Sequence, residues 1–109
     1  NDLTDTSVIA LSQSKKLNQL VSLNLSKNNI TDAGAKALAD SSSLGKLKKL
    51  DLNFNRIGDE GARAIAGSPN FVNLESLKLG QNKIGTEGAQ ALNESKTLQN
   101  LVHPVFGFY

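Results

Sequence analysis

A fixed spacing of 27 residues runs through the whole chain of 109 residues. Leucine recurs with this step at Leu20, Leu47, Leu74 and Leu101, and several isoleucine, glycine, alanine and asparagine positions repeat with the same step. A period of 20 to 50 residues is typical of repeat architectures, in which each unit packs mainly against its neighbours. Because four such units account for nearly the whole chain, the spacing leaves no room for a separate domain.

Each unit contains the pattern Leu-x-x-Leu-x-Leu-x-x-Asn-x-Ile, followed by a segment rich in glycine and alanine. Leu23 and Leu25 alternate with polar residues, which predicts a short strand with one buried and one exposed face. From Thr31 and Asp32 onward, cap-type residues precede alanines and Leu38 at helical spacing, which predicts a helix. Stacked units would place their strands side by side in a parallel sheet, with equivalent leucines in a row.

Two further columns of the repeat predict specific contacts. They consist of Asn28, Asn55 and Asn82, and of Gly34, Gly61 and Gly88. The asparagine amide can both donate to and accept from backbone groups where the chain leaves the sheet, so stacked copies would form a ladder. Glycine early in a helix costs about 1 kcal/mol relative to alanine. Its recurrence therefore indicates that a side chain there would collide with the neighbouring strand or repeat.

The pattern resembles the leucine-rich repeat of the intracellular, ribonuclease-inhibitor-like subfamily. Three full matches cover residues 20–30, 47–57 and 74–84, and the resemblance extends over essentially the whole chain. It implies an α/β solenoid, a right-handed βα superhelix of about four 27-residue repeats with a parallel sheet on the concave face. It also implies a non-enzymatic scaffold that binds another protein through the concave face and its rim.

The repeat suggests how residues 1–109 are divided within one leucine-rich-repeat domain, which we expect to be a fragment of a longer protein. An N-terminal half-repeat would cover residues 1–19, full repeats 20–46, 47–73 and 74–100, and a cap-like segment 101–109. Pro104 stands where the other units have leucine and cannot donate to a sheet, which favours an irregular end over residues 102–109. Exposed edge strands make self-association a further expectation.

Composition argues against several other classes of protein. The chain has no cysteine, a net charge of +2 and no Lys/Arg run longer than two, so no disulfide, thiol chemistry or nucleic-acid footprint is expected. No apolar stretch is long enough to span a membrane. The acidic residues Asp59, Glu60 and Glu87 stand at helix starts, where the helix dipole favours negative charge, and His103 has no catalytic partner. We therefore expect no catalysis, no cofactor and no nucleic-acid or membrane partner.

A short acidic pattern, Asp51-x-Asn53-x-Asn55, looks like the first half of a calcium loop. The glycine and the final carboxylate that such a loop needs are replaced by Arg56 and Ala62. The simpler interpretation is that Asn55 is the asparagine of the repeat. We therefore expect no metal site.

The exposed positions of the predicted strands are the candidate partner-binding residues, because they vary between repeats while the buried positions do not. They are Ser22, Asn24, Lys27, Lys49, Asp51, Asn53, Phe54, Ser76, Lys78 and Gln81. The alternative is that these side chains are only solvated. Phe54 favours recognition, since an aromatic residue at an otherwise polar position is a common interface anchor, although it could instead pack inward at the strand end.

Two other functions remain open. Some ribonuclease-inhibitor-like proteins activate small GTPases, and the two arginines Arg56 and Arg63 would have to serve such a role, although neither lies in a recognisable finger loop. The chain could also be an architectural segment of a larger receptor or a bacterial effector. The resemblance favours the cytoplasm, or the host cytosol in the case of an effector.

Overall fold

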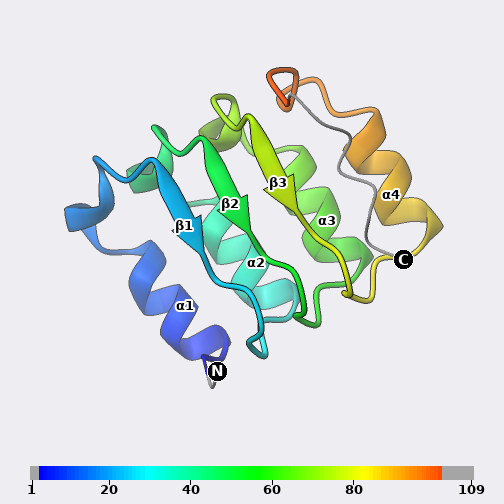
Figure 1. The fold of residues 1–109 in the computed structure, drawn as a ribbon, viewed down its shortest axis with the longest axis horizontal. Helices are drawn as coiled ribbons and strands as arrows, with labels where there is room; N and C mark the ends of the chain where they lie inside the picture. Colours follow the sequence, from blue (N-terminus) through cyan, green and yellow to red (C-terminus); the bar gives the residue numbers. More distant parts are fainter. Residues whose placement is uncertain (1–2, 102–109) are drawn as a thin grey trace.

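The computed structural model describes residues 3–101, so the expected terminal segment 102–109, with His103 and Pro104, lies outside the described residues. Four helices of equal length alternate with three short strands (Figure 1). The helices are α1 Asp5–Ser12, α2 Asp32–Ala39, α3 Asp59–Ala66 and α4 Thr86–Asn93; the strands are β1 Ser22–Asn24, β2 Lys49–Asp51 and β3 Ser76–Lys78. Short 3-10 turns, η1 Lys15–Leu17, η2 Ser42–Leu44 and η3 Pro69–Phe71, lie between helix and strand. Each element recurs after 27 residues.

The three strands form a parallel sheet in the order β1-β2-β3. Leu23 pairs with Leu50, and Leu50 pairs with Leu77, so the leucines of equivalent repeat positions stand in one row. This register confirms the prediction from the spacing. It follows because each coil contains the same number of residues and therefore meets its neighbour without an offset.

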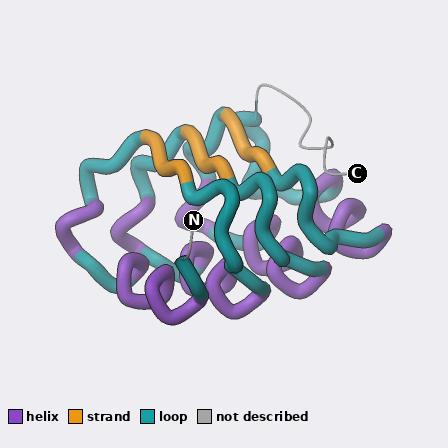
Figure 2. The backbone as a smooth tube through the Cα atoms, turned by 60° about the horizontal axis from the view of Figure 1, so that its bottom comes forward, coloured by secondary structure: helices purple, strands orange, loops and turns teal. Residues whose placement is uncertain are grey.

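The strands lie on one side of the molecule and the helices on the other (Figure 2). Strands stack about 4.8 Å apart, whereas packed helices need about 8 to 10 Å, so the sheet must occupy the inner, concave side. With the helices behind the sheet, successive strands step to the right in Figure 1, which is the right-handed crossover expected for parallel βαβ units. The predicted α/β leucine-rich-repeat solenoid is confirmed.

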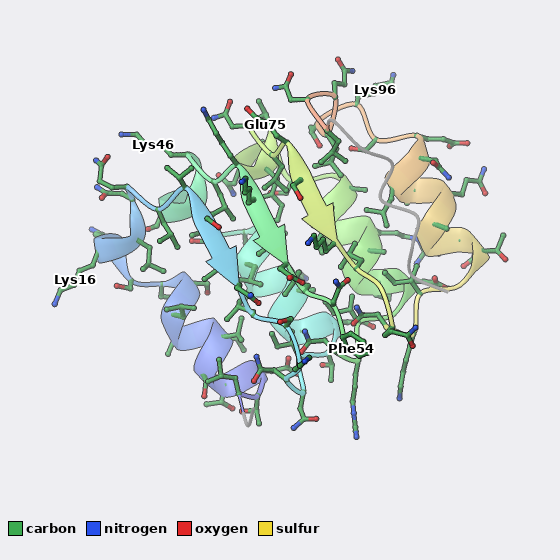
Figure 3. The ribbon with its side chains drawn as sticks, in the orientation of Figure 1. Lys16, Lys46, Phe54, Glu75 and Lys96 are labelled. Atoms are coloured by element: carbon green, nitrogen blue, oxygen red, sulfur yellow. The ribbon has the colours of Figure 1, made fainter. Side chains whose placement is uncertain are left out.

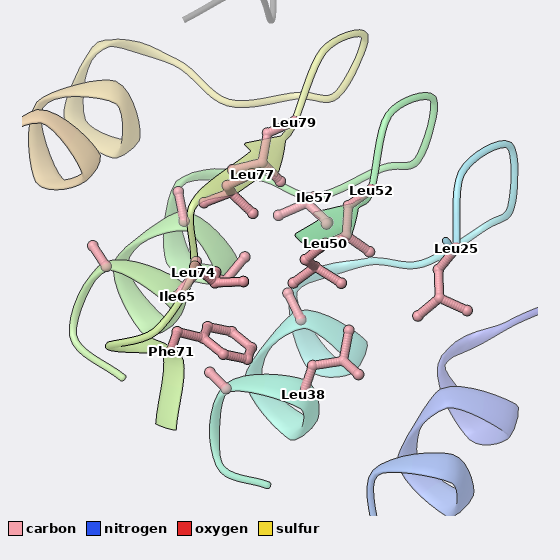
Figure 4. Close-up of a cluster of buried hydrophobic side chains, with 14 of the residues drawn as sticks. Leu25, Leu38, Leu50, Leu52, Ile57, Ile65, Phe71, Leu74, Leu77 and Leu79 are labelled. Atoms are coloured by element: carbon pink, nitrogen blue, oxygen red, sulfur yellow. The ribbon is translucent and has the colours of Figure 1, made fainter. Parts of the chain in front are cut away.

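The core fills the space between sheet and helices (Figure 4). Leu50 and Leu52 reach it from β2 and the turn after it, and Ile65 reaches it from α3; each is at most 1% exposed. In contrast, Leu23 in the edge strand β1 is only partly buried. Each repeat therefore depends on both neighbours to bury its leucines, as expected for a solenoid.

The asparagine column forms the predicted ladder. The Asn55 side chain donates to Leu25 O of the preceding repeat at 2.9 Å and to Leu52 O of its own repeat at 3.1 Å. Its Oδ1 accepts from Ile30 N of the preceding repeat at 3.0 Å. One buried side chain thus satisfies backbone groups of two coils where they turn away from the sheet.

The helix starts differ from the sequence expectation. A local cap is expected at Thr31, but its side chain makes no cap contact with α2, and Gly58 and Gly85, at the starts of α3 and α4, have no side chain that could cap. Instead, Asp32 Oδ1 accepts from Gly58 N at 2.6 Å and from Gly61 N at 3.0 Å, both in the next repeat. The N-terminus of α3 is therefore capped by a carboxylate from α2.

The same arrangement recurs along the helix row. Asp59 Oδ1 caps α4 through Gly85 N and Gly88 N, at 2.7 and 2.9 Å, and Asp5 contacts the start of α2 in the same way. The dipole interpretation of Asp59 was therefore incomplete, because its carboxylate holds the helix of the next repeat. The sequence pattern did not reveal this contact.

The recurrent glycines have the predicted steric cause. A Cβ on Gly61 would lie 2.8 Å from Asp32 Oδ1 and 3.1 Å from Ala35 Cβ, both in the preceding helix. Those distances are shorter than normal contacts. Glycine therefore lets the start of α3 approach α2 closely enough to receive the Asp32 cap.

Candidate binding surface

The described residues hold no obvious centre for chemistry. No group of three or more His, Cys, Asp or Glu side chains that could bind a metal lies together within residues 3–101. Asp51 projects from a strand, whereas the Asn55 oxygen accepts from Ile30 N inside the turn, so the calcium-like pattern does not converge on one point. None of the helices in this range is long and apolar enough to cross a membrane. The exposed side of the sheet, which carries most of the predicted partner-binding residues, is the candidate site.

The first and third residues of each strand form the face of the sheet that points to solvent, on the concave side of the solenoid. These six residues, here called the sheet face, are Ser22, Asn24, Lys49, Asp51, Ser76 and Lys78. Since side chains alternate along a strand, they project away from the leucine core. Together with Leu23 and Leu50 they line a hollow of about 250 Å³. Six of the predicted partner-binding residues are thus brought together.

Within the hollow, charged side chains of both signs are adjacent. Lys49 and Lys78 are exposed, whereas Asp51 and Ser76 are half-buried. Asp51 pairs in register with Lys78 on the next strand, and its Oδ1 accepts from Asn53 N at 3.0 Å. The carboxylate is held by its own turn, while both ammonium groups extend toward solvent.

Three of the predicted residues, Lys27, Phe54 and Gln81, occupy the turns that follow the strands. All three adopt left-handed backbone conformations, with φ of 60°, 60° and 56°. This conformation costs a non-glycine residue about 1 to 2 kcal/mol. Nothing in these three residue types predicts it, because none of them is glycine or asparagine, which favour positive φ.

Phe54 projects outward at the strand end (Figure 3). Its side chain is 52% exposed, while its backbone N–H donates to Gly80 O at 2.8 Å. The alternative that Phe54 packs inward is therefore wrong. The turn fixes the backbone of this residue and presents its ring beside the sheet face.

Asn53 has a clear structural contact. It is half-buried, and its Oδ1 accepts from Gly80 N of the next repeat at 2.6 Å. Asn24 likewise accepts from Ser26 N at 3.0 Å within its own turn. Both residues hold the strand-end turns in shape, so Lys49, Lys78 and Phe54 are the more available groups for a partner.

Two cations in the turns after the strands are not among the predicted residues. Arg56 and Lys83 occupy one repeat column two residues beyond Phe54 and Gln81, and both are exposed. Their backbone N–H groups each donate to the preceding repeat, to Ile30 O and Ile57 O at 2.8 Å. The 27-residue step predicts this column, because Arg56 and Lys83 each directly follow the repeat asparagine.

The two arginines have different surroundings. Arg63 lies on the helix side and pairs with Glu60 at 2.7 Å and with Glu87 of the next repeat at 2.6 Å. Arg56 lies at a strand-end turn. Arg63 is therefore held by two carboxylates, and only Arg56 extends from the candidate surface.

A model of the leucine-rich repeat family matches the chain at residues 16–39, 46–66 and 72–92, which together make up more than half of its length. Each matched segment includes one strand and most or all of the helix that follows it. A comparison with curated proteins gives no significant match.

Proposed function

The chain belongs to the leucine-rich-repeat family, and we propose that it is a non-enzymatic scaffold that binds another protein through its sheet face and the strand-end turns. Leucine-rich repeats are generally protein-interaction modules, and the family is typically non-enzymatic. We also propose that the chain is of the ribonuclease-inhibitor-like type and acts in the cytoplasm. The repeat length supports the first proposal, and the absence of cysteine fits the reducing compartment of the second.

The exposed ring of Phe54 is the observation that carries this proposal. A phenylalanine in a left-handed turn loses backbone stability, and at 52% exposure it recovers only part of its hydrophobic contribution. Folding alone would therefore be served better by glycine or asparagine. Aromatic side chains held rigidly on a surface are the groups that most often dominate binding energy in protein interfaces.

The size of the sheet supports a site that extends beyond the strands. Three strands of three residues cover a patch of only about 10 by 10 Å at standard strand spacings. A standard interface buries about 800 Å² on each partner. A partner that lies on the sheet face must therefore also contact the adjoining turns, including Phe54, Arg56 and Lys83.

Phe54→Asn tests the proposal, because asparagine accepts a positive φ and should leave the fold intact. Val72→Thr is the control, since Val72 is also an exposed apolar residue, at 43%, but lies at the opposite end of the strands. We expect purified Phe54→Asn to capture specific partners from a cell extract at least about tenfold less well than wild type, in line with a hot-spot residue. Val72→Thr should capture them normally.

Equal capture by wild type, Phe54→Asn and a Lys49→Glu/Lys78→Glu variant would refute a binding role for this surface. Circular dichroism spectra and melting curves of all variants establish that each is folded. A partner lost only in the Val72→Thr variant would place the binding surface at the other rim.

A further inference from the structure

The small net charge conceals an uneven distribution of charge. We divide the described chain into a strand-and-turn half, residues 14–30, 41–57, 68–84 and 95–101, and a helix half, residues 3–13, 31–40, 58–67 and 85–94. The strand-and-turn half carries ten Lys and Arg residues but only two carboxylates, Asp51 and Glu75. The helix half carries seven carboxylates but only two cations, Lys36 and Arg63. The solenoid is thus basic on one side and acidic on the other.

The acidic groups of the helix half are largely engaged within the fold. Asp32 and Asp59 cap the helices of the following repeats, and Asp5 does so for α2. Glu60 and Glu87 pair with Arg63. Most of the carboxylates in the helix half therefore stabilise the fold itself.

Four cations of the basic side lack such compensation among the described residues. Both ion pairs between described residues involve Arg63, so Lys49, Lys78, Arg56 and Lys83 have no carboxylate partner within residues 3–101. Lys49 and Lys78 line the hollow of the sheet face. Arg56 and Lys83 are exposed on the turns beyond the strand ends. Unpaired charges of one sign that surround a concave surface attract a ligand of the opposite sign.

More cations border the surface at the other end of the strands. Figure 3 shows Lys46 and Lys96 on this side, with Glu75 between them. Lys46 is held by Gln19 Oε1 at 3.0 Å and not by a carboxylate. The sheet face therefore lies between two basic rims.

We propose that the partner contributes an acidic segment of polypeptide, whose carboxylates lie on Lys49 and Lys78 and whose apolar side chain packs on Phe54. This inference rests on the proposed scaffold function and names the chemistry of its partner. Charge complementarity is the feature that selects among partners and speeds association. The apolar contact supplies affinity that ion pairs at a wet surface do not.

A protein segment fits this surface better than a nucleic acid. Asp51 stands between Lys49 and Lys78, where a continuous phosphate chain would meet a like charge. A peptide need not place a carboxylate at that point. It can instead offer a backbone N–H that donates to Asp51. Phe54 and Val21, exposed at 52% and 48%, offer apolar contacts that phosphates cannot use.

The test measures binding of fluorescent probes to the folded chain by anisotropy. The probes are a peptide of alternating Glu and Leu, the same peptide with Lys in place of Glu, and an oligouridine RNA of similar charge. We expect the acidic peptide to bind at least about tenfold more tightly than the basic one. The affinity for the acidic peptide should fall steeply as the ionic strength rises from about 0.05 to about 0.5 M, because salt screens the attraction between exposed charges.

Matched variants show whether the binding site is the sheet face. Lys49→Glu, Lys78→Glu and the control Lys36→Glu each change the net charge by the same amount, and Lys36 is exposed on α2 in the helix half. We expect each sheet-face variant to weaken binding of the acidic peptide by about fivefold or more, because it places like charges together. Lys36→Glu should weaken it less than twofold.

Several results would overturn the inference. These are equal effects of all three variants, tighter binding of the RNA than of the acidic peptide, or tighter binding of the basic peptide. Failure of the scaffold function is a separate outcome. If capture of partners from an extract depends on Phe54 but not on Lys49 or Lys78, the scaffold function stands and the acidic partner is refuted.

Discussion

The Asp32 cap predicts that removing one carboxylate weakens the helix of the next repeat. In the Asp32→Ala variant, α3 loses two hydrogen bonds, to Gly58 N at 2.6 Å and to Gly61 N at 3.0 Å. Hydrogen bonds to charged groups contribute about 1.5 to 3 kcal/mol each, but their sum is an upper bound because water can reach the half-buried Gly58. The buried Gly61 N–H would be left without an acceptor. We expect a loss of about 2 to 4 kcal/mol in the free energy of unfolding.

Chemical denaturation followed by circular dichroism measures the total effect, with Asp40→Ala as the matched control. Asp40 is exposed at the C-terminal end of the same helix, and its side chain makes no hydrogen bond with the described residues. A carboxylate at that end opposes the helix dipole. The control should therefore change the free energy of unfolding by no more than about 0.5 kcal/mol.

Amide hydrogen exchange tells the two explanations of Asp32 apart. If the carboxylate caps the next repeat, Asp32→Ala should reduce the protection of the Gly61 amide and the first turn of α3, while α2 keeps most of its protection. If Asp32 acts only through the dipole of its own helix, the loss should appear in α2. Faster exchange confined to α2 would refute the inter-repeat cap.

Three further variants test other parts of the structure. Leu50→Ala should lower the free energy of unfolding by about 2 to 5 kcal/mol and Leu23→Ala by less than half as much, because the edge leucine is only partly buried; urea titrations that gave equal losses would contradict this. Asn55→Ala should lower it by about 2 to 4 kcal/mol, since Ile30 N loses its acceptor, and a melting temperature unchanged from wild type would contradict the ladder. Phe54→Asn should change it by less than about 0.5 kcal/mol, because relief of the left-handed backbone offsets the lost apolar contact; a large loss of stability would show that the ring has a structural role.

The repeat predicted the strands, their register and the core, because those depend on a count of residues and on which positions are apolar. Leu23, Leu50 and Leu77 align for that reason alone. The Asp32 cap was not predictable in the same way. The recurrence of aspartate at this repeat position can be read from the sequence. Whether the carboxylate turns toward its own helix or across to Gly61 depends on how closely two helices approach.

The sequence pattern also did not predict the backbone conformation of the strand-end turns. Lys27, Phe54 and Gln81 share no chemistry that signals a positive φ, and only the geometry of the turn imposes it. For the same reason the sequence left open whether Phe54 is buried or exposed. The outward position of its ring follows from the turn and not from its hydrophobicity.

The contacts that hold the coils together leave the sheet side free to vary. Asn55, Asp32 and Ser41 each reach into an adjoining coil, the last through Ser41 Oγ donating to Ser12 O at 2.6 Å. These side chains lie at the turns and on the helix side, where the same residue types recur. Lys49 and Lys78 project from the other side and take no part in such contacts. A change of residue on the sheet face therefore alters the charge offered to a partner without loosening the stack, and an inter-repeat asparagine or aspartate has no such freedom.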